Sequence, residues 1–355
     1  MLDGLEVRRT SKPKPVPSPA PRFGSIFSDH IFSMHYQDGT WQRPVIEPYE
    51  DIQLGLGASV LHYAQTVFEG MKAFAGPDGR VQVFRPEAHA ARFARSARRI
   101  CMPELPPEIF VESVMRLVAE DARWVRGNPE GALYIRPLMF ATEPFLGVRP
   151  SNDYRFVVMS CPVGTYSGDS FSPTRIWVER QAVRAAPGGV GEAKTGGNYA
   201  ASLAGQMAAK SRGYDQVLWT DALRHENVEE VGTMNVFFRF EDEVATPALS
   251  GTILPGITRA SVIELLADKG VNVKERQISV REVIEGARTG RLLEVFGTGT
   301  AAVVTPVGVL GHEEGETVIG SGEPGSLTKE LFDRLSAMQR GLEPDPKGWL
   351  KLVTA

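Results

Sequence analysis

Cysteine is scarce in this sequence, with only Cys101 and Cys161 among 355 residues. The two form no CxxC pair and have no metal-ligand spacing, so neither a disulfide framework nor a zinc site is expected. The six histidines are scattered, and only His30 and His35 lie close together. We expect two buried thiols in a reducing compartment and no bound metal.

The sequence also lacks an excess of either charge and any long apolar run. Its 39 Lys and Arg residues and 43 Asp and Glu residues give a formal net charge of -4. A chain without a strongly basic surface gives no reason to expect nucleic acid or an acidic membrane as a partner. Arg8 and Arg9 are followed by residues without the apolar core of a signal peptide, and no later stretch could span a bilayer. We expect a cytoplasmic protein.

The length of 355 residues is about twice the usual domain size, which favours two domains. Residues 11–21 contain five prolines and are predicted to form an extended, mobile arm. We predict an N-terminal arm over residues 1–24, a small α/β domain over 25–166, an interdomain loop over 167–182 and a large domain over 183–355.

Short apolar segments and longer helical patterns follow one another without strict alternation. This favours α+β domains over a single parallel sheet. Asp78-Gly79 between two alternating segments predicts a hairpin. Phe237 and Phe238 are expected in the core. We predict strands at 59–63, 70–74, 81–84, 132–136, 154–159, 216–220, 235–239, 292–296 and 301–304, and helices at 87–99, 108–123, 198–211, 257–269 and 326–340.

Residues 188–199 combine glycines with Lys194 ahead of a predicted helix. A solvated lysine in a surface loop is the simplest interpretation. A phosphate-binding loop is the second, since Gly188, Lys194 and Thr195 have the required offsets, but Ala193 stands where that loop has glycine. A Schiff-base lysine is the third. Because a lysine amine has a pKa of about 10.4, it must be desolvated or crowded by another cation to act as a nucleophile near neutral pH.

The segment Lys194-Thr-Gly-Gly-Asn-Tyr199 resembles the lysine segment of branched-chain amino-acid aminotransferases, which are fold-type IV pyridoxal-phosphate enzymes of the class IV aminotransferase family. Further segments resemble the same family in the same order over roughly residues 25–340: Leu61-His-Tyr-Ala64, Phe68-Glu-Gly-Met-Lys-Ala-Phe74, Phe84-Arg-Pro86, Leu133-Tyr-Ile-Arg-Pro137, Cys161-Pro-Val-Gly164, Glu230-Val-Gly-Thr-Met-Asn235, Leu254-Pro-Gly256 and Glu294-Val-Phe-Gly-Thr-Gly-Thr300. The resemblance implies an α+β, two-domain fold-type IV fold. The active site is expected at the domain interface, and the large domain is expected to bind the cofactor.

Pyridoxal phosphate is an electron sink only while its ring nitrogen stays protonated, which requires a nearby carboxylate. In the Glu229-Glu230 pair, neighbours on an extended segment point to opposite faces, so only one can reach the ring. The resemblance selects Glu230, and Glu229 is expected to be solvated.

The cofactor phosphate requires donors and a cation. Pro255-Gly256 before Ile257-Thr258 predicts a helix N-terminus, where free amides favour an anion. Helical periodicity places Arg92, Arg95 and Arg99 on one face and does not choose among them. The resemblance selects Arg92.

Tyr134 and Arg136 lie two apart in a predicted strand and therefore share a face. A guanidinium beside a phenol is suited to binding a carboxylate in a fork. The resemblance implies that this arginine meets the side-chain carboxylate of glutamate. It further implies an apolar pocket wall from Phe68 and from Tyr63 and Val148 of the partner subunit, amides at Thr300 and Ala301 that hold the substrate's α-carboxylate, a cofactor contact by Tyr199, and weaker site candidates at Thr233 and Tyr166.

The implied activity is reversible, ping-pong transfer of an amino group between Leu, Ile or Val and 2-oxoglutarate, with Lys194 as the catalytic Schiff-base residue. The implied assembly is a homodimer with shared active sites. D-amino-acid aminotransferases, (R)-amine transaminases and 4-amino-4-deoxychorismate lyases would share the lysine and the carboxylate, but are not expected to keep Tyr134-x-Arg136. A nucleotide-binding P-loop protein is the alternative from another class. The residues do not rank Leu, Ile and Val as substrates.

Overall fold

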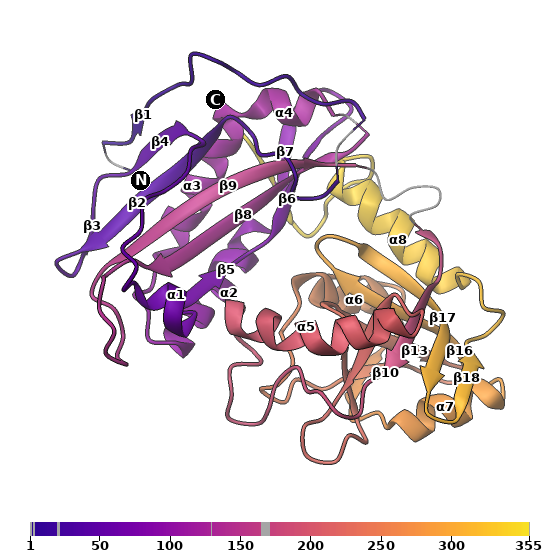
Figure 1. The fold of residues 1–355 in the computed structure, drawn as a ribbon. Helices are drawn as coiled ribbons and strands as arrows, with labels where there is room; N and C mark the ends of the chain where they lie inside the picture. The colour runs from indigo at the N-terminus through magenta and orange to yellow at the C-terminus, as the bar shows by residue number, and fades with distance from the viewer. Residues whose placement is uncertain (1, 3, 20–21, 129, 165–170, 355) are drawn as a thin grey trace. The chain divides into compact units, whose positions relative to one another are not determined.

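A computed structural model describes residues 2, 4–19, 22–128, 130–164 and 171–354 of the chain (Figure 1). The chain divides into two compact units. Unit 1 comprises Met1–Thr165, Ala193–Gly196 and Ala337–Ala355, and unit 2 comprises Tyr166–Glu192 and Gly197–Ser336. The short segment with Lys194 therefore belongs with the N-terminal part of the chain. Residues 167–170 of the predicted interdomain loop lie outside the described residues.

Unit 1 is built on a ten-stranded sheet in the order β1-β4-β2-β9-β8-β6-β7-β19, with β3 paired to β2 and β5 paired to β8. The long central strands β8 and β9 run antiparallel and place Tyr134 opposite Cys161. The strands are β1 (Glu6–Val7), β2 (His30–Gln37), β3 (Thr40–Trp41), β4 (Val45–Pro48), β5 (Thr66–Phe68), β6 (Met71–Ala75), β7 (Val81–Phe84), β8 (Ala132–Ala141), β9 (Tyr154–Val163) and β19 (Leu350–Leu352).

The helices of unit 1 are α1 (Ser59–Tyr63), α2 (Pro86–Arg99), α3 (Pro107–Glu120) and α4 (Ala122–Arg126). In Figure 1, α3 lies behind β2 and β9. Its apolar residues recur every three or four positions, and Phe110 and Val114 are fully buried. Phe110 packs in one aromatic cluster with Phe93 of α2 and Phe156 of β9. The core of unit 1 therefore fixes α2, which carries Arg92, against the sheet.

Unit 2 contains a nine-stranded mixed sheet in the order β12-β11-β10-β17-β16-β13-β14-β15, with β18 paired to β17. Phe237 and Phe238 on β13 are fully buried, as predicted. The strands are β10 (Thr174–Val178), β11 (Gln216–Thr220), β12 (Val228–Val231), β13 (Asn235–Phe240), β14 (Val244–Pro247), β15 (Val273–Arg276), β16 (Leu292–Gly299), β17 (Val303–His312) and β18 (Gly315–Val318). The helices are α5 (Gly196–Ser211), α6 (Ile257–Asp268), α7 (Val280–Arg288) and α8 (Ser326–Gln339).

The α+β class is confirmed, and the predicted helices and hairpin are present with small shifts at their ends. The strand predicted at residues 59–63 is wrong, because these residues form α1. Its apolar spacing fits a strand, but a five-residue segment has little intrinsic preference and follows its tertiary contacts. Ala58 forms a bridge with Pro144, and the Tyr63 hydroxyl donates to the Leu146 carbonyl at 2.6 Å. The last predicted strand begins at Val303, because residues 300–302 form a turn.

The expectation of two buried thiols is wrong for Cys101, which is exposed, whereas Cys161 is buried and both are free. Cys101 follows the last turn of α2 and has a positive φ of 56°.

The proline-rich arm is held to unit 1 at several points. The Lys14 amide donates to Asp29 at 2.9 Å, its amine donates to the Ser28 carbonyl at 3.0 Å, and Arg9 pairs with Glu120 at 2.6 Å. These contacts anchor residues 9–14, which a mobile arm would not show. Among the described residues, no helix combines the length and apolar character needed to cross a bilayer.

Candidate active site

The backbone around Lys194 is fixed to two elements of unit 1. The Lys194 carbonyl accepts the Phe68 amide at 3.0 Å, and the Lys194 amide donates to the Ser96 hydroxyl of α2 at 2.9 Å. The Thr195 hydroxyl donates to the Thr66 carbonyl at 2.7 Å. These bonds attach the segment to the edge of β5. Lys194 is therefore not a freely solvated loop residue, and its half-buried side chain has a defined direction.

Two cations contact the ring of Phe68. The Lys194 amine is 4.8 Å from the centroid of its ring, and the Arg136 guanidinium carbon is 4.6 Å from the same centroid. An aromatic face attracts cations and excludes water from them. The structure thus brings together three predicted site residues: the lysine, the arginine and the aromatic wall.

Tyr134 and Arg136 share one face of β8, as their spacing predicts. An Arg136 terminal nitrogen donates to the Tyr134 hydroxyl at 3.1 Å, and its guanidinium carbon is 5.4 Å from the Tyr134 ring. The Nε of Arg136 is buried and makes no hydrogen bond. A buried donor without an acceptor carries a desolvation cost of about 1–3 kcal/mol, which a bound anion would relieve. The pair is therefore suited to a carboxylate.

Arg92 is 3% exposed, whereas its two rivals on α2, Arg95 and Arg99, are exposed. It forms a bidentate pair with Glu69, with Nε and a terminal nitrogen at 2.7 Å and 2.8 Å from the carboxylate oxygens. His89 Nδ1 lies 2.7 Å from Glu69 Oε2. Burial opposes the charge on Glu69, but Arg92 and His89 outweigh it and hold the pKa of that carboxyl well below its usual range.

Two residues that sequence reasoning missed in this unit are Glu69 and Lys72. Glu69 directly follows Phe68, a predicted pocket residue, and this adjacency was the only indication of it in the sequence. Lys72 is a second buried amine, 6% exposed and opposite Tyr134 in the β6–β8 register. Burial and the nearby Arg340 lower the pKa of Lys72 to about 7. Lys72 must therefore be distinguished from Lys194 in any test of the reactive lysine.

Phe23, in the arm, is a third residue that the sequence did not indicate. Its ring is edge-on to Tyr134, with centroids 4.9 Å apart and an interplanar angle of 81°. Phe23 is 53% exposed although it touches a phenol that is 7% exposed. It adds an apolar surface beside the Tyr134–Arg136 pair. A lone aromatic residue after a proline-rich stretch was the only signal.

Tyr63 and Val148, expected to serve a partner subunit, lie on exposed parts of unit 1. Tyr63 is 46% exposed on α1, and Val148 is 86% exposed in the loop between β8 and β9. The Tyr63 hydroxyl bonds to Leu146 of the same loop. The loop and α1 thus form one exposed feature that carries both residues.

Unit 2 carries the predicted carboxylate on β12. Glu230 is 2% exposed, and its Oε1 accepts the Leu254 amide at 2.7 Å. The Nε of Arg184 lies 3.0 Å from its Oε2. Arg184 was not predicted, because it lies in an irregular stretch 46 positions before Glu230 and no local pattern links the two.

The expectation that Glu229 is solvated is wrong. Glu229 is 6% exposed, its Oε1 accepts the Thr252 hydroxyl at 2.5 Å, and its Oε2 is buried without a hydrogen bond. Burial raises the pKa of Glu229, and the Thr252 hydroxyl and Arg184 only partly offset this. Side-chain alternation correctly predicts that Glu229 and Glu230 point to opposite faces of β12. It could not reveal that both carboxylates are buried, because both faces of this strand are covered.

Ile257 and Thr258 begin α6, as predicted, and both are buried. The N-cap is Gly256, which makes no side-chain cap hydrogen bond to the first turn, and the N-terminal amides of a helix are suited to binding an anion. A Cβ atom at Gly256 would lie 1.9 Å from Asn235 Oδ1, and the Asn235 amide donates to the Leu254 carbonyl at 2.9 Å. Only glycine fits this approach to the helix.

The remaining predicted residues of unit 2 lie at turns or on α5. Thr300 and Ala301 occupy the turn between β16 and β17, with Thr300 half-buried and Ala301 exposed. Thr233 is exposed in the turn between β12 and β13, and Tyr199 is half-buried on α5. Tyr166 lies outside the described residues.

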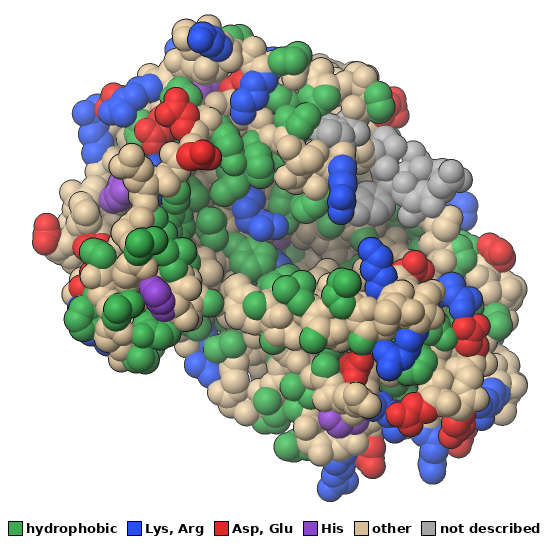
Figure 2. Space-filling view, in the orientation of Figure 1, with side chains coloured by type: hydrophobic (Ala, Val, Ile, Leu, Met, Phe, Trp, Pro, Cys, Tyr) green, Lys and Arg blue, Asp and Glu red, His purple; other side chains and the backbone are tan. Residues whose placement is uncertain are grey.

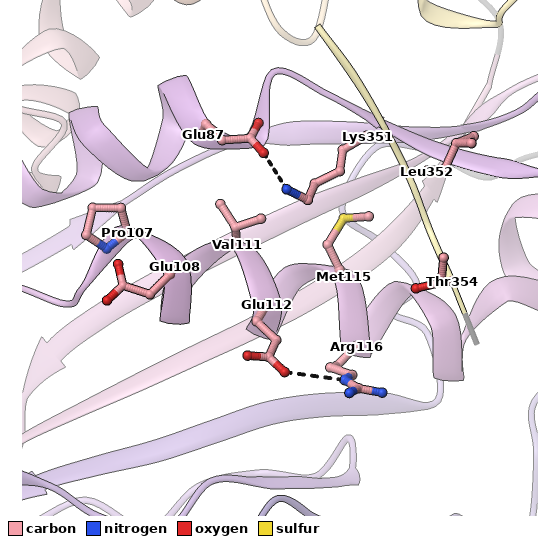
Figure 3. Close-up of a pocket in the computed structure, with 10 residues that line it drawn as sticks. All are labelled: Glu87, Pro107, Glu108, Val111, Glu112, Met115, Arg116, Lys351, Leu352 and Thr354. Carbon is pink, nitrogen blue, oxygen red and sulfur yellow. Dashed lines mark hydrogen bonds and ion pairs between the residues drawn. The ribbon is translucent and has the colours of Figure 1, made fainter. Parts of the chain in front are cut away.

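A separate pocket of about 590 Å³ lies in unit 1, where α2 and α3 approach the C-terminal strand (Figure 3). Val111 and Met115 point into it, and the Lys351 amine bonds to Glu87 at its rim at 2.6 Å. None of the predicted site residues is among the described residues that line it.

Comparison with known proteins gives a consistent result. A model of the family described as amino-transferase class IV matches residues 66–309. A branched-chain-amino-acid aminotransferase of Mycolicibacterium smegmatis is 48% identical over 336 residues, covering 93% of this chain and 91% of the relative. Branched-chain-amino-acid transaminase 1 of Bacillus subtilis is 48% identical over 340 residues, covering 95% of each chain.

Solved structures agree with these relatives. The Escherichia coli branched-chain amino acid aminotransferase superposes with a TM-score of 0.75 at 28% identity, covering 92% of this chain and 99% of that one. The T.th. branched-chain amino acid aminotransferase, complexed with N-(5'-phosphopyridoxyl)-L-glutamate, gives a TM-score of 0.73 at 27% identity and covers 90% and 98%. The family match decides against the nucleotide-binding alternative.

Proposed function

The chain belongs to the class IV aminotransferase family, and we propose that it is a pyridoxal-phosphate-dependent branched-chain amino-acid aminotransferase. It transfers an amino group reversibly between Leu, Ile or Val and 2-oxoglutarate, in two half-reactions. The observation that carries this proposal is the placement of the Lys194 amine and the Arg136 guanidinium on one aromatic ring, that of Phe68. One group can react with an amino acid while the other binds a carboxylate.

The described residues provide the groups that pyridoxal phosphate requires. In unit 1, Lys194 supplies an amine and Arg92 a cation, and in unit 2 the N-terminus of α6 supplies amide donors and Glu230 a buried carboxylate; we propose that these groups hold the cofactor. We propose that Ile257, Thr258, Thr300, Tyr199 and Thr233 complete the cofactor contacts.

When bound, pyridoxal phosphate supplies an electron sink for the bonds of the substrate's α-carbon. With the cofactor bound, Lys194 would hold it through its Nζ, and an incoming amino acid would displace this amine. The freed Nζ would then take the proton from the α-carbon of the donor amino acid, and in the second half-reaction it would give a proton to the α-carbon that derives from the acceptor 2-oxo acid. The bonds from Lys194 to Ser96 and Phe68 hold the backbone still while the side chain moves. Ping-pong kinetics follow, because both substrates use this one amine.

One pocket must accept both an apolar side chain and a carboxylate. Phe68 and Phe23 offer apolar surface for Leu, Ile and Val. Arg136 and Tyr134 offer a guanidinium and a phenol for the side-chain carboxylate of glutamate or 2-oxoglutarate. We propose that amides at Thr300 and Ala301 hold the α-carboxylate, which both substrates share.

The substitution Lys194→Ala tests the proposal directly. The parent protein should be yellow, transaminate leucine with 2-oxoglutarate, and after borohydride reduction carry the cofactor on the peptide that contains Lys194. Lys194→Ala should lose the linkage and the activity. The matched control is Lys72→Met, which removes the other buried amine and should keep the linkage. Attachment at Lys72, or unchanged leucine turnover by Lys194→Ala, would refute the assignment, and preference for D-amino acids or (R)-amines would refute the substrate class.

We further propose a homodimer in which Tyr63 and Val148 serve the partner's site. Support comes from an apolar patch over α1 and the β8–β9 loop, visible in Figure 2 as a cluster of apolar side chains over α1. A patch of this kind is typical of a protein interface. Gel filtration should give a dimer, and an active monomer would refute shared sites. The exposed residues of the patch are Leu56, Leu61, Tyr63, Phe145, Leu146 and Val148.

We also propose that the enzyme works in the cytoplasm. Its two free cysteines, one of them exposed, are consistent with a reducing compartment.

A further inference from the structure

Arg184 is a buried cation that the mechanism above does not use. It is 7% exposed and lies in unit 2, in the irregular stretch between β10 and α5. Its three nitrogens each have an acceptor: Nε reaches Glu230 at 3.0 Å, one terminal nitrogen donates to the Thr252 carbonyl at 2.7 Å, and the other donates to the Gly191 carbonyl at 3.3 Å. Two backbone carbonyls therefore hold the guanidinium plane, and the Nε–H is directed at the carboxylate.

The backbone acceptors are themselves fixed. A Cβ atom at Gly191 would lie 2.4 Å from the Thr252 carbonyl oxygen, so these two stretches of backbone are in close contact and only glycine fits. The Thr252 hydroxyl is bonded to Glu229 at 2.5 Å and to the Ser250 hydroxyl at 2.8 Å. Because each acceptor has its own support, the position of Arg184 is determined by the fold and not by Glu230 alone.

Two buried carboxylates, Glu229 and Glu230, face this one cation. The direct contact goes to Glu230, whose second oxygen takes the Leu254 amide. Glu229 receives a neutral hydroxyl from Thr252, and burial raises the pKa of Glu229. A cation and an amide donor therefore contact Glu230, both of which favour its ionised form, whereas Glu229 contacts a neutral hydroxyl.

We propose that Arg184 is a positioning residue for Glu230, which it orients and keeps ionised so that the ring nitrogen of the cofactor, and not the carboxylate, holds the shared proton. This inference rests on the proposed function. A proton between a pyridine nitrogen and a carboxylate goes to the more basic partner, and a cation in contact with the carboxylate lowers its basicity. The same cation would also disfavour a positive ring nitrogen, but a ring N–H bound to the free lone pairs of Glu230 would be farther from Arg184 than the carboxylate is, and Coulomb energy falls with distance.

The arrangement also fixes direction. A carboxylate has about four lone-pair sites, so Glu230 can accept from Arg184 and Leu254 and still accept from a ring N–H. In metal sites, mutation of a residue that hydrogen-bonds a metal ligand typically lowers activity by about 10- to 100-fold. We expect loss of Arg184 to lower activity by an amount at the lower end of that range.

The test is Arg184→Met, reconstituted with pyridoxal phosphate labelled with ¹⁵N at the ring nitrogen. The parent should show the ¹⁵N shift of a protonated ring. The variant should show a shift moved toward the unprotonated position and a leucine kcat lowered about tenfold, with cofactor affinity nearly unchanged because the phosphate contacts remain. The matched control is Arg239→Met, which removes another arginine that pairs with a buried glutamate of unit 2, Glu294 at 2.5 Å. It should leave the ¹⁵N shift unchanged.

Arg184→Lys keeps the positive charge but loses the planar set of guanidinium donors. It serves as the test if Arg184→Met does not fold. It should keep most of the ring protonation and lose part of kcat through orientation. A parent-like ¹⁵N shift in Arg184→Met, or in the absence of that variant a fully unprotonated ring in Arg184→Lys, would overturn the inference. A parent that does not bind the cofactor at all would instead refute the proposed function, so the two failures are distinct.

Discussion

Removing the charge of Arg136 should separate the two substrate classes of one pocket. In Arg136→Met the unbranched side chain can still lie against the Phe68 ring, where the guanidinium carbon now sits 4.6 Å from the centroid. The variant loses a buried Nε–H that has no protein acceptor and a terminal nitrogen that bonds to Tyr134 at 3.1 Å. It therefore loses the anion-binding groups and keeps most of the apolar wall.

The size of the effect follows from the contacts. A hydrogen bond to a charged group contributes about 1.5–3 kcal/mol. Since about 1.4 kcal/mol is a tenfold change, kcat/KM for glutamate and for 2-oxoglutarate should fall roughly 10- to 150-fold. Leucine has no side-chain carboxylate, so kcat/KM for its half-reaction should change by less than about threefold. The substitution also removes the buried Nε–H that lacks an acceptor, which relieves a desolvation cost.

Single-turnover kinetics of each half-reaction provide the assay, because they follow leucine and glutamate separately. The matched control is Arg212→Met, which removes an arginine 4.9 Å from the Trp177 ring centroid in unit 2 and should alter neither substrate. Equal losses for leucine and glutamate would refute the reasoning, since they would mean that Arg136 supports the fold and not the carboxylate.

Two further predictions concern buried carboxylates. In the cofactor-free protein, Glu69→Gln leaves Arg92 buried without an anion, so urea unfolding should show a loss of about 3 kcal/mol at neutral pH. Because the pKa of Glu69 is lowered, this contribution is present above the ordinary value of 4.5 and is lost as the pH falls through the folded value. An equal loss at all pH values would contradict the pairing. Glu229 has a raised pKa, so its ionisation weakens the folded state as the pH rises from 4.5 through the folded value. Glu229→Gln should thus stabilise the protein by about 1 kcal/mol at pH 8 relative to pH 4, and a parent-like pH profile of unfolding would show that Glu229 is not buried as described.

Local patterns predicted much of the fold and part of the site. The recurrence of apolar residues in α3 identified its buried face, and the alternation in β8 placed Tyr134 and Arg136 together. These inferences succeeded because side-chain direction follows directly from helical or extended periodicity. The five residues of α1 failed because their contacts, and not their intrinsic preference, decide their conformation.

The sequence by itself determined the class of the protein, the identity of Lys194 as the residue to examine, and the order of the five longest helices and of fewer than half of the strands that the structure describes. Only the tertiary structure revealed that Glu229 is buried, that Glu69 holds Arg92, that Phe23 touches Tyr134 and that Arg184 pairs with Glu230. The reason is physical. Each of these features depends on contacts between residues that are distant in sequence. The periodicity of a segment predicts which face is buried, but not which distant segment packs against that face.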